Sequence, residues 1–260
     1  MYIDSHCHTA LDWYEPIESL LYQMDNNNVE KAVLIQMLGQ FDNHYLQACV
    51  KKYPERFVSV VGVDVNQADA CDQLEALVEQ GAKGLRLRPT APLASATKKR
   101  DDPLALWRKA EALGIPISCV GNTTTFNSPE FIQIIELHPR LVIVLEHLGG
   151  TSTPDQAIAC VQARMKIHEL ARYPNVYIKM TGLGELIPRG QFSQKPQSLI
   201  NAFKTFGAER MMWGSDYPPV SSREGYRNAL NAPQNFFKTY DEQAIDALFY
   251  KTANKVFFSS

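Results

Sequence analysis

The segment Met1-Tyr2-Ile3-Asp4-Ser5-His6-Cys7-His8 begins apolar and ends in two histidines one residue apart. Because residues i and i+2 of a strand point to the same side, His6 and His8 are expected to project together, close enough to share one ion. The alternative is a strand end with two solvated or hydrogen-bonded histidines. An open doubly wound sheet usually has a glycine-rich turn after its first strand, so histidines here favour a closed barrel.

Short apolar, β-branched runs recur along the whole chain, and their starts lie roughly 25 to 35 residues apart, the length of one strand plus one helix. The expected strands are Tyr2–Asp4, Ala32–Gln36, Phe57–Val63, Gly84–Arg88, Pro116–Val120, Leu141–Leu145, Val176–Met180 and Arg210–Gly214. The expected helices include Glu15–Asn26, Ala70–Gln80, Ser128–Leu137, a segment from Thr153 to about Arg172, and Gln243–Phe258. Eight such units predict a parallel, eight-stranded (β/α)8 TIM barrel of the α/β class. The chain has no composition shift or long linker, so we expect one domain over residues 1–260.

The composition excludes several classes of protein. The chain has 260 residues, of which 45% are hydrophobic, and a net charge of −2. This charge offers no general attraction for nucleic acid or anionic lipid, so we expect a small-molecule substrate and leave a homo-oligomer open. Five cysteines without a CxxC pair are typical of reduced thiols in the cytoplasm. No leader and no apolar stretch of about 18 residues is evident, so no membrane span is expected.

Ionisable residues follow the apolar strands at the end where (β/α)8 barrels form their active sites. His6 and His8 end the first strand, His147 follows the sixth, and Asp216 follows the eighth. Three imidazoles and one carboxylate suit a single divalent metal ion with room for water. Zinc suits this ligand set best, and manganese is the alternative.

Three basic residues at strand ends are candidates for binding the substrate. Arg86 and Arg88 are expected on one face, where guanidinium groups suit a carboxylate-bearing or polyhydroxylated substrate. Lys179 is either a further substrate contact or a structural partner of Asp64 or Glu146. Glu146 is expected to point away from His147 and to form a buried ion pair.

The strand ends resemble those of the amidohydrolase superfamily, specifically its amidohydrolase-related branch of lactonases, decarboxylases and hydratases. The resemblance covers essentially the whole chain. It rests on Asp4–His8, Gly84–Arg86, Glu146–Gly149, Lys179–Gly182 and the highly specific segment Phe206–Pro218. The lactonase subgroup is the closest, because Glu-His-Leu-Gly and Lys-x-Thr-Gly occur together.

The resemblance implies a role for each matching residue. His6, His8, His147 and Asp216 match metal ligands, with His147 and Asp216 also catalytic and Asp216 handling the proton of the attacking water. Two features depart from the pattern of other members. The segment 116–122 has no histidine, and Lys83 lies at the wrong end of its strand to bridge two ions, so a binuclear centre is not expected.

These observations predict a metal-dependent hydrolase, most simply a lactonase that opens a sugar or carboxylate-bearing lactone. A carbon–carbon lyase that decarboxylates an unsaturated or aromatic acid is the alternative, and the missing histidine in 116–122 argues against it. A barrel that has lost activity and only binds ligands is a third reading. The intact set of three histidines and one aspartate argues against that one.

Overall fold

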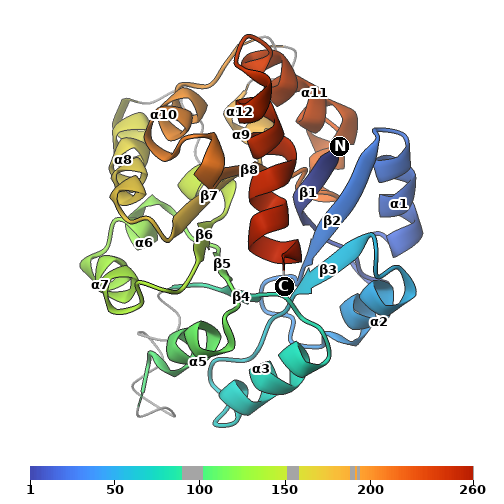
Figure 1. The fold of residues 1–260 in the computed structure, drawn as a ribbon, viewed down its shortest axis with the longest axis vertical. Coiled ribbons are helices and arrows are strands. Elements are labelled where there is room, and N and C mark those ends of the chain that lie inside the picture. The colour runs from blue at the N-terminus through green and yellow to red at the C-terminus, as the bar shows by residue number, and fades with distance from the viewer. Residues whose placement is uncertain (90–101, 151–157, 188–190, 192–193, 260) are drawn as a thin grey trace.

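The computed structural model describes residues 1–89, 102–150, 158–187, 191 and 194–259, although not the side chains of 158–161. Eight strands alternate with helices along the chain (Figure 1). The strands are β1 (Tyr2–Cys7), β2 (Val29–Ile35), β3 (Phe57–Val60), β4 (Leu85–Leu87), β5 (Ile117–Cys119), β6 (Ile143–Leu145), β7 (Val176–Met180) and β8 (Met211–Trp213). Each overlaps one of the eight predicted strands.

The strands pair in parallel, in the order β1-β2-β3 in one sheet and β4-β5-β6-β7-β8 in the other. Two isolated parallel bridges link the sheets, one between Val61 and Leu85 and one between Cys7 and Tyr217. The predicted parallel α/β class is confirmed. The pattern of strand pairing differs from the prediction of one continuous eight-stranded sheet. The strands form two sheets, which are joined only by the two single bridges among the described residues.

Helices follow the strands as the sequence predicts. They are α1 (Ile17–Asp25), α2 (His44–Lys52), α3 (Ala70–Glu79), α5 (Ala105–Leu113), α6 (Thr123–Phe126), α7 (Pro129–Leu137), α8 (Ile158–His168), α9 (Leu183–Leu186), α10 (Gln197–Phe206), α11 (Tyr226–Phe237) and α12 (Glu242–Asp246), with π-helical turns at Ala247–Lys251 and Asn254–Phe258. Ser128 caps α7 by accepting a hydrogen bond from the Phe131 N–H at 3.2 Å. The predicted helix start at Thr153 lies outside the described residues. None of the helices described is long and apolar enough to cross a membrane.

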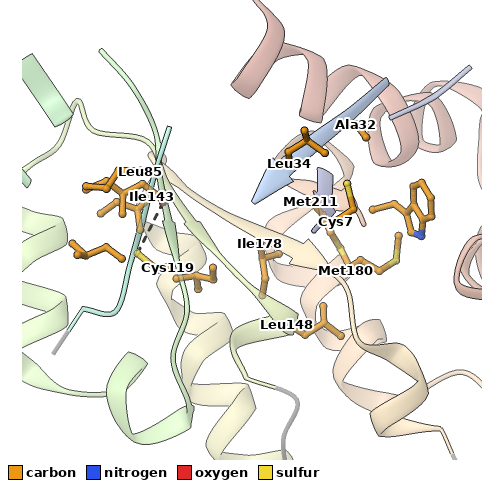
Figure 2. Packing of buried hydrophobic residues seen from close by; sticks show 14 of the residues in the cluster. Cys7, Ala32, Leu34, Leu85, Cys119, Ile143, Leu148, Ile178, Met180 and Met211 are labelled. Atoms are coloured by element: carbon orange, nitrogen blue, oxygen red, sulfur yellow. Dashed lines mark hydrogen bonds between the residues drawn. The ribbon is translucent and has the colours of Figure 1, made fainter. Parts of the chain in front are cut away.

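Side chains on the strands alternate between two hydrophobic clusters. One, the outer cluster, joins residues such as Cys7, Leu34, Ile143 and Met211 to the helices, and Figure 2 shows these four on strands of both sheets. The other, the inner cluster, contains Ile3, Val33, Ile35, Val58, Val60, Val144, Tyr177 and Met212, together with Ala253 and Phe257 near the C-terminus. Period-two alternation therefore buries both faces of the strands.

A bulge in β1 decides which of its side chains face inward. Asp4 pairs with Ala32 and Cys7 pairs with Leu34, so three steps along β1 match two steps along β2. The extra residue reverses the alternation, so that Ile3 faces the inner cluster whereas Cys7 faces the outer one. His6 and His8 consequently face inward, beyond the apolar part of the strand.

Asp4 joins the first strand to the last. Its Oδ1 accepts hydrogen bonds from the His6 N–H at 3.1 Å and the Ser215 N–H at 2.8 Å, and its Oδ2 accepts one from the Tyr226 hydroxyl at 2.9 Å. The side chain is fully buried, and burial raises its pKa although these hydrogen bonds oppose the rise. No role for Asp4 was predicted from the sequence.

We predict that Asp4→Ala lowers the free energy of unfolding by about 3 kcal/mol or more, because it leaves three buried donors without an acceptor. Asp4→Asn is the matched control. It keeps an oxygen for the two backbone donors, and the Tyr226 hydroxyl can rotate to accept, so it should cost no more than about 1 kcal/mol. Urea unfolding near neutral pH measures both. Equal losses in the two variants would contradict the role of the hydrogen bonds.

Candidate active site

His6, His8 and Asp216 lie close together where the chain leaves β1 and β8. Asp216 Oδ1 lies 3.7 Å from His6 Nε2 and 3.7 Å from His8 Nε2. These distances are too long for hydrogen bonds. They are close to the spacing of about 3.3–3.4 Å between two donor atoms that share one tetrahedral zinc ion. These three residues form one of two described groups with the spacing of metal ligands.

His147 reaches the same place by a sharp turn of the backbone. Its φ is 53° and that of Leu148 is 52°, both in the left-handed region that residues with a Cβ seldom adopt. The centre of the His147 ring lies 4.9 Å from the centre of the His6 ring, and His147 Nδ1 lies 2.9 Å from Thr181 Oγ1. Asp216 also has a left-handed φ, of 61°. Strained backbone thus occurs at two of the predicted site residues.

Glu146 departs from the prediction that it points away from the site. It lies beside His6 and His147, with 3.9 Å from Oε1 to His6 Nδ1 and 4.0 Å from Oε2 to His147 Nε2. It follows Leu145 of the outer cluster and so faces inward by ordinary alternation, whereas the left-handed turn brings His147 to the same side. Its expected role as a buried ion-pair partner agrees with the structure, since Arg86 Nη2 donates to Oε2 at 2.7 Å.

Arg86 is positioned at the site and is largely engaged there. Besides the bond to Oε2, its Nε donates to Glu146 Oε1 at 3.2 Å and its Nη1 donates to the Gln36 carbonyl at 2.9 Å. A guanidinium has five N–H groups, so donors remain for a ligand. Arg88 is exposed and lies in an adjacent cavity of about 430 Å³, whose wall also includes Arg86.

Lys179 is placed differently from the predicted substrate contact. It is fully buried and is absent from the described wall of the main cavity. Its Nζ donates to Ser118 Oγ at 3.0 Å, lies 3.3 Å from His6 Nδ1, and sits over the Phe257 ring at 5.3 Å. Position 179 shares the inward face of β7 with Tyr177, so the amine lies beneath the histidines and supports them.

The main cavity has a volume of about 620 Å³ and opens over the histidines. Its wall includes His8, Tyr14, Met37, Leu38, Gln40, Arg86, His147, Glu185, Asp216 and Arg223. Sequence reasoning missed Tyr14, whose ring centre lies 5.5 Å from that of His8, and Arg223, whose Nη2 donates to Asp216 Oδ2 at 2.7 Å. Both residues stand on loops, where no periodic pattern indicates a direction.

Burial and neighbouring charges shift the pKa values of these groups. Burial lowers the pKa of His6 well below its usual value, and Lys179 and His147 lower it further. Burial also lowers the pKa of His147, although Asp216 and Glu146 oppose this. Burial raises the pKa of Asp216, but His8, His147 and Arg223 outweigh that effect and leave the pKa below its ordinary value. The site therefore favours neutral imidazoles at His6 and His147 beside an ionised Asp216.

The donor set fits a divalent cation. His8 Nδ1 lies 2.7 Å from the Ile35 carbonyl, so Nδ1 carries the proton and the Nε2 lone pair is available. His6 Nε2 is buried and has no hydrogen-bond partner among the described residues. Lys179 opposes the fit at one point, because an ammonium donating to His6 Nδ1 leaves the imidazole proton on Nε2. Ligation through that atom therefore requires the Lys179–His6 pair to lose a proton.

We predict that ionised Glu146 stabilises the fold above about pH 4.5 and that this contribution is lost as the pH falls. Burial raises its pKa, but Arg86 and Lys179 outweigh burial and lower the pKa from 4.5 to about 2. Because the folded-state value is the lower one, stability falls as pH drops through this window, by about 3 kcal/mol. Urea unfolding between pH 7 and pH 2 should show a steeper loss for the wild type than for Glu146→Gln. Parallel curves would contradict the ion pair.

The chain is similar to known proteins over most of its length. The model of a family described as amidohydrolase matches residues 3–258. The chain is similar to L-fucono-1,5-lactonase from Burkholderia ambifaria, with 28% identity over 245 residues, which cover 86% of this chain and 82% of the relative.

Solved structures share the fold. An amidohydrolase from Burkholderia multivorans with bound zinc has a TM-score of 0.83 at 18% identity, and the match covers 100% of both chains. The 2,6-dihydroxybenzoate decarboxylase from Rhizobium has a TM-score of 0.69 at 15% identity over 99% of this chain and 98% of that one. The chain belongs to the amidohydrolase family and is an enzyme of the hydrolase class.

Proposed function

We propose that this enzyme is a metal-dependent lactonase that acts on a neutral, polyhydroxylated lactone. One observation carries the proposal, namely that His6, His8, His147 and Asp216 converge in one cluster beneath a cavity of about 620 Å³. The proposal takes the two linked parallel sheets as a closed (β/α)8 barrel, as the family match implies.

His6, His8, His147 and Asp216 would hold one divalent ion, and zinc suits these ligands best. Such an ion polarises a carbonyl and makes bound water more acidic. Asp216 Oδ1 is the acceptor for the proton of the attacking water as its oxygen bonds to the lactone carbonyl carbon. The ring C–O bond then breaks, and Asp216 returns the proton to the leaving alkoxide, which gives a hydroxy acid.

The charges in the cavity wall support an uncharged substrate. Arg86 is paired with Glu146, and Arg223 is paired with both Asp216 and Glu185. Neither guanidinium in the described wall therefore carries an unbalanced charge for a carboxylate. Their remaining N–H groups suit hydroxyl groups instead. The similarity to an L-fucono-1,5-lactonase supports the same substrate class.

A decarboxylase that acts on an aromatic or unsaturated acid is the second candidate, because a decarboxylase shares the fold. The segment between Ile117 and Asn122 provides no histidine. The paired arginines likewise leave no excess positive charge among the described wall residues to bind an acid. Both points favour hydrolysis.

We predict that Asp216→Asn lowers turnover by about 10²–10⁴-fold, the range for loss of a general acid–base group, while the fold remains stable. The amide keeps the size of the side chain but cannot take the proton. Initial rates on the best lactone and thermal unfolding measure the two effects. Turnover near that of the wild type would exclude Asp216 as the base.

A panel of substrates tests the reaction and the substrate class together. We predict that the purified protein opens neutral aldonolactones, and that it opens a pyrone dicarboxylate at least about 10-fold more slowly, since an unpaired buried carboxylate is costly. Acid release is followed with a pH indicator, and elemental analysis of the same sample identifies the metal. Faster opening of the dicarboxylate would overturn the substrate class, and release of carbon dioxide from aromatic acids would favour the lyase.

A further inference from the structure

The backbone of Asp216 is fixed on both sides. Its N–H donates to the His6 carbonyl at 2.8 Å, and its own carbonyl accepts from the Val220 N–H at 3.0 Å. These bonds place the Cα but leave the carboxylate free to turn about its side-chain torsions. A separate contact must therefore determine which oxygen faces the histidines.

Arg223 supplies that contact. Its bond to Asp216 Oδ2, at 2.7 Å, is the one hydrogen bond within 3.5 Å that this carboxylate accepts from the side chains of the described residues. The other oxygen, Oδ1, is left at 3.7 Å from each of His6 Nε2 and His8 Nε2. The two oxygens thus have different surroundings, one held by a guanidinium and one directed to the histidine pair.

Arg223 is itself held by two carboxylates, those of Glu185 and the neighbouring Glu224. Its Nη1 donates to Glu185 Oε1 of α9 at 2.7 Å, and its Nε lies 3.5 Å from Glu224 Oε2. Glu224 is fixed in turn, since its Oε1 accepts from the Gly184 N–H at 3.0 Å. A Cβ at position 184 would overlap the Glu224 carboxylate, so this close approach requires glycine. The guanidinium therefore cannot turn away from Asp216 without breaking its contacts to Glu185 and Glu224.

We propose that Arg223 is a positioning residue for the hydrolytic reaction, which holds Asp216 so that only Oδ1 is presented to the histidine pair and to the attacking water. The inference rests on the proposed function, because it assigns Asp216 the proton of that water. Glu185 does not contact Asp216 directly in this scheme but acts through Arg223, whose guanidinium it holds. This order of contacts predicts a graded loss when the residues are replaced, the largest at Arg223 and a smaller one at Glu185.

Kinetics of four variants test the inference. Arg223→Met should lower kcat by about 10–100-fold, because a displacement of about 1 Å in a reacting group can cost 10²-fold, with KM changed less than about threefold. Arg223→Lys keeps one donor and should recover part of kcat, and Glu185→Gln should lose less than Arg223→Met. Arg56→Met is the matched control, because Arg56 forms a partly buried ion pair with Asp25 at 2.8 Å away from the cavity. Its kcat should stay within about twofold of the wild type.

Two results would overturn the inference, namely a kcat for Arg223→Met within threefold of the wild type, or an equal loss in Arg56→Met. If Arg223→Met does not fold, the double variant Arg223→Met with Glu185→Gln takes its place in the comparison. The double variant also removes one of the negative charges that surround the guanidinium.

A crystal structure of Arg223→Met tests the inference without any substrate. We expect the Asp216 carboxylate to rotate, so that Oδ1 is no longer equidistant from His6 Nε2 and His8 Nε2. An unchanged carboxylate would overturn the inference. If the wild type opens no lactone, the proposed function fails, and the position of the carboxylate still decides whether Arg223 holds Asp216.

Discussion

The Asp4 carboxylate is the constraint on which the site most depends, because it joins the first strand to the segment that follows the last strand. One oxygen accepts the backbone N–H groups of both His6 and Ser215, residues that are far apart in sequence. Two further backbone hydrogen bonds join the same two segments, one from the Asp216 N–H to the His6 carbonyl and one from the His8 N–H to the Tyr217 carbonyl. These hydrogen bonds therefore fix the backbone positions of His6, His8 and Asp216 relative to one another.

The charges of the site balance before any cation is added. Arg86, Lys179 and Arg223 face Glu146, Asp216 and Glu185, and Lys179, Glu146 and Asp216 are buried. Burying an unpaired charge is costly, so each group restricts the others. A divalent ion would disturb this balance, and Lys179, 3.3 Å from His6 Nδ1, is the cation that opposes it most directly. Burial lowers the pKa of Lys179 to about 8, so the opposing charge is one that the site can give up.

Sequence reasoning predicted the parts of the fold and site that depend on periodicity. The eight strands follow from apolar runs. The pairing of His6 with His8 follows from strand alternation, and the two side chains lie on one side although β1 has a bulge between Asp4 and Cys7. The direction of Glu146 was predicted wrongly, since a left-handed turn at His147 cannot be read from alternation. Arg223 and Tyr14 stand on loops that carry no such pattern. Asp4 did offer a signal, as a carboxylate inside an apolar strand, although two of its partners, Ser215 and Tyr226, lie far away in the sequence.

The inner face of the strands explains why chemistry occurs at one end only. Glu146 lies two residues after Val144, and Lys179 lies two residues after Tyr177, so the inward side chains change from apolar to charged along β6 and β7. At the apolar end, Phe257 and Ala253 join the inner cluster and exclude water, and the C-terminal helical segment crosses the strands there (Figure 1). Lys179 lies at the boundary, with its amine over the Phe257 ring. The charged groups thus lie against an apolar layer, and the low polarity of this layer strengthens their mutual attraction. A substrate approaches them from the opposite side, through the main cavity.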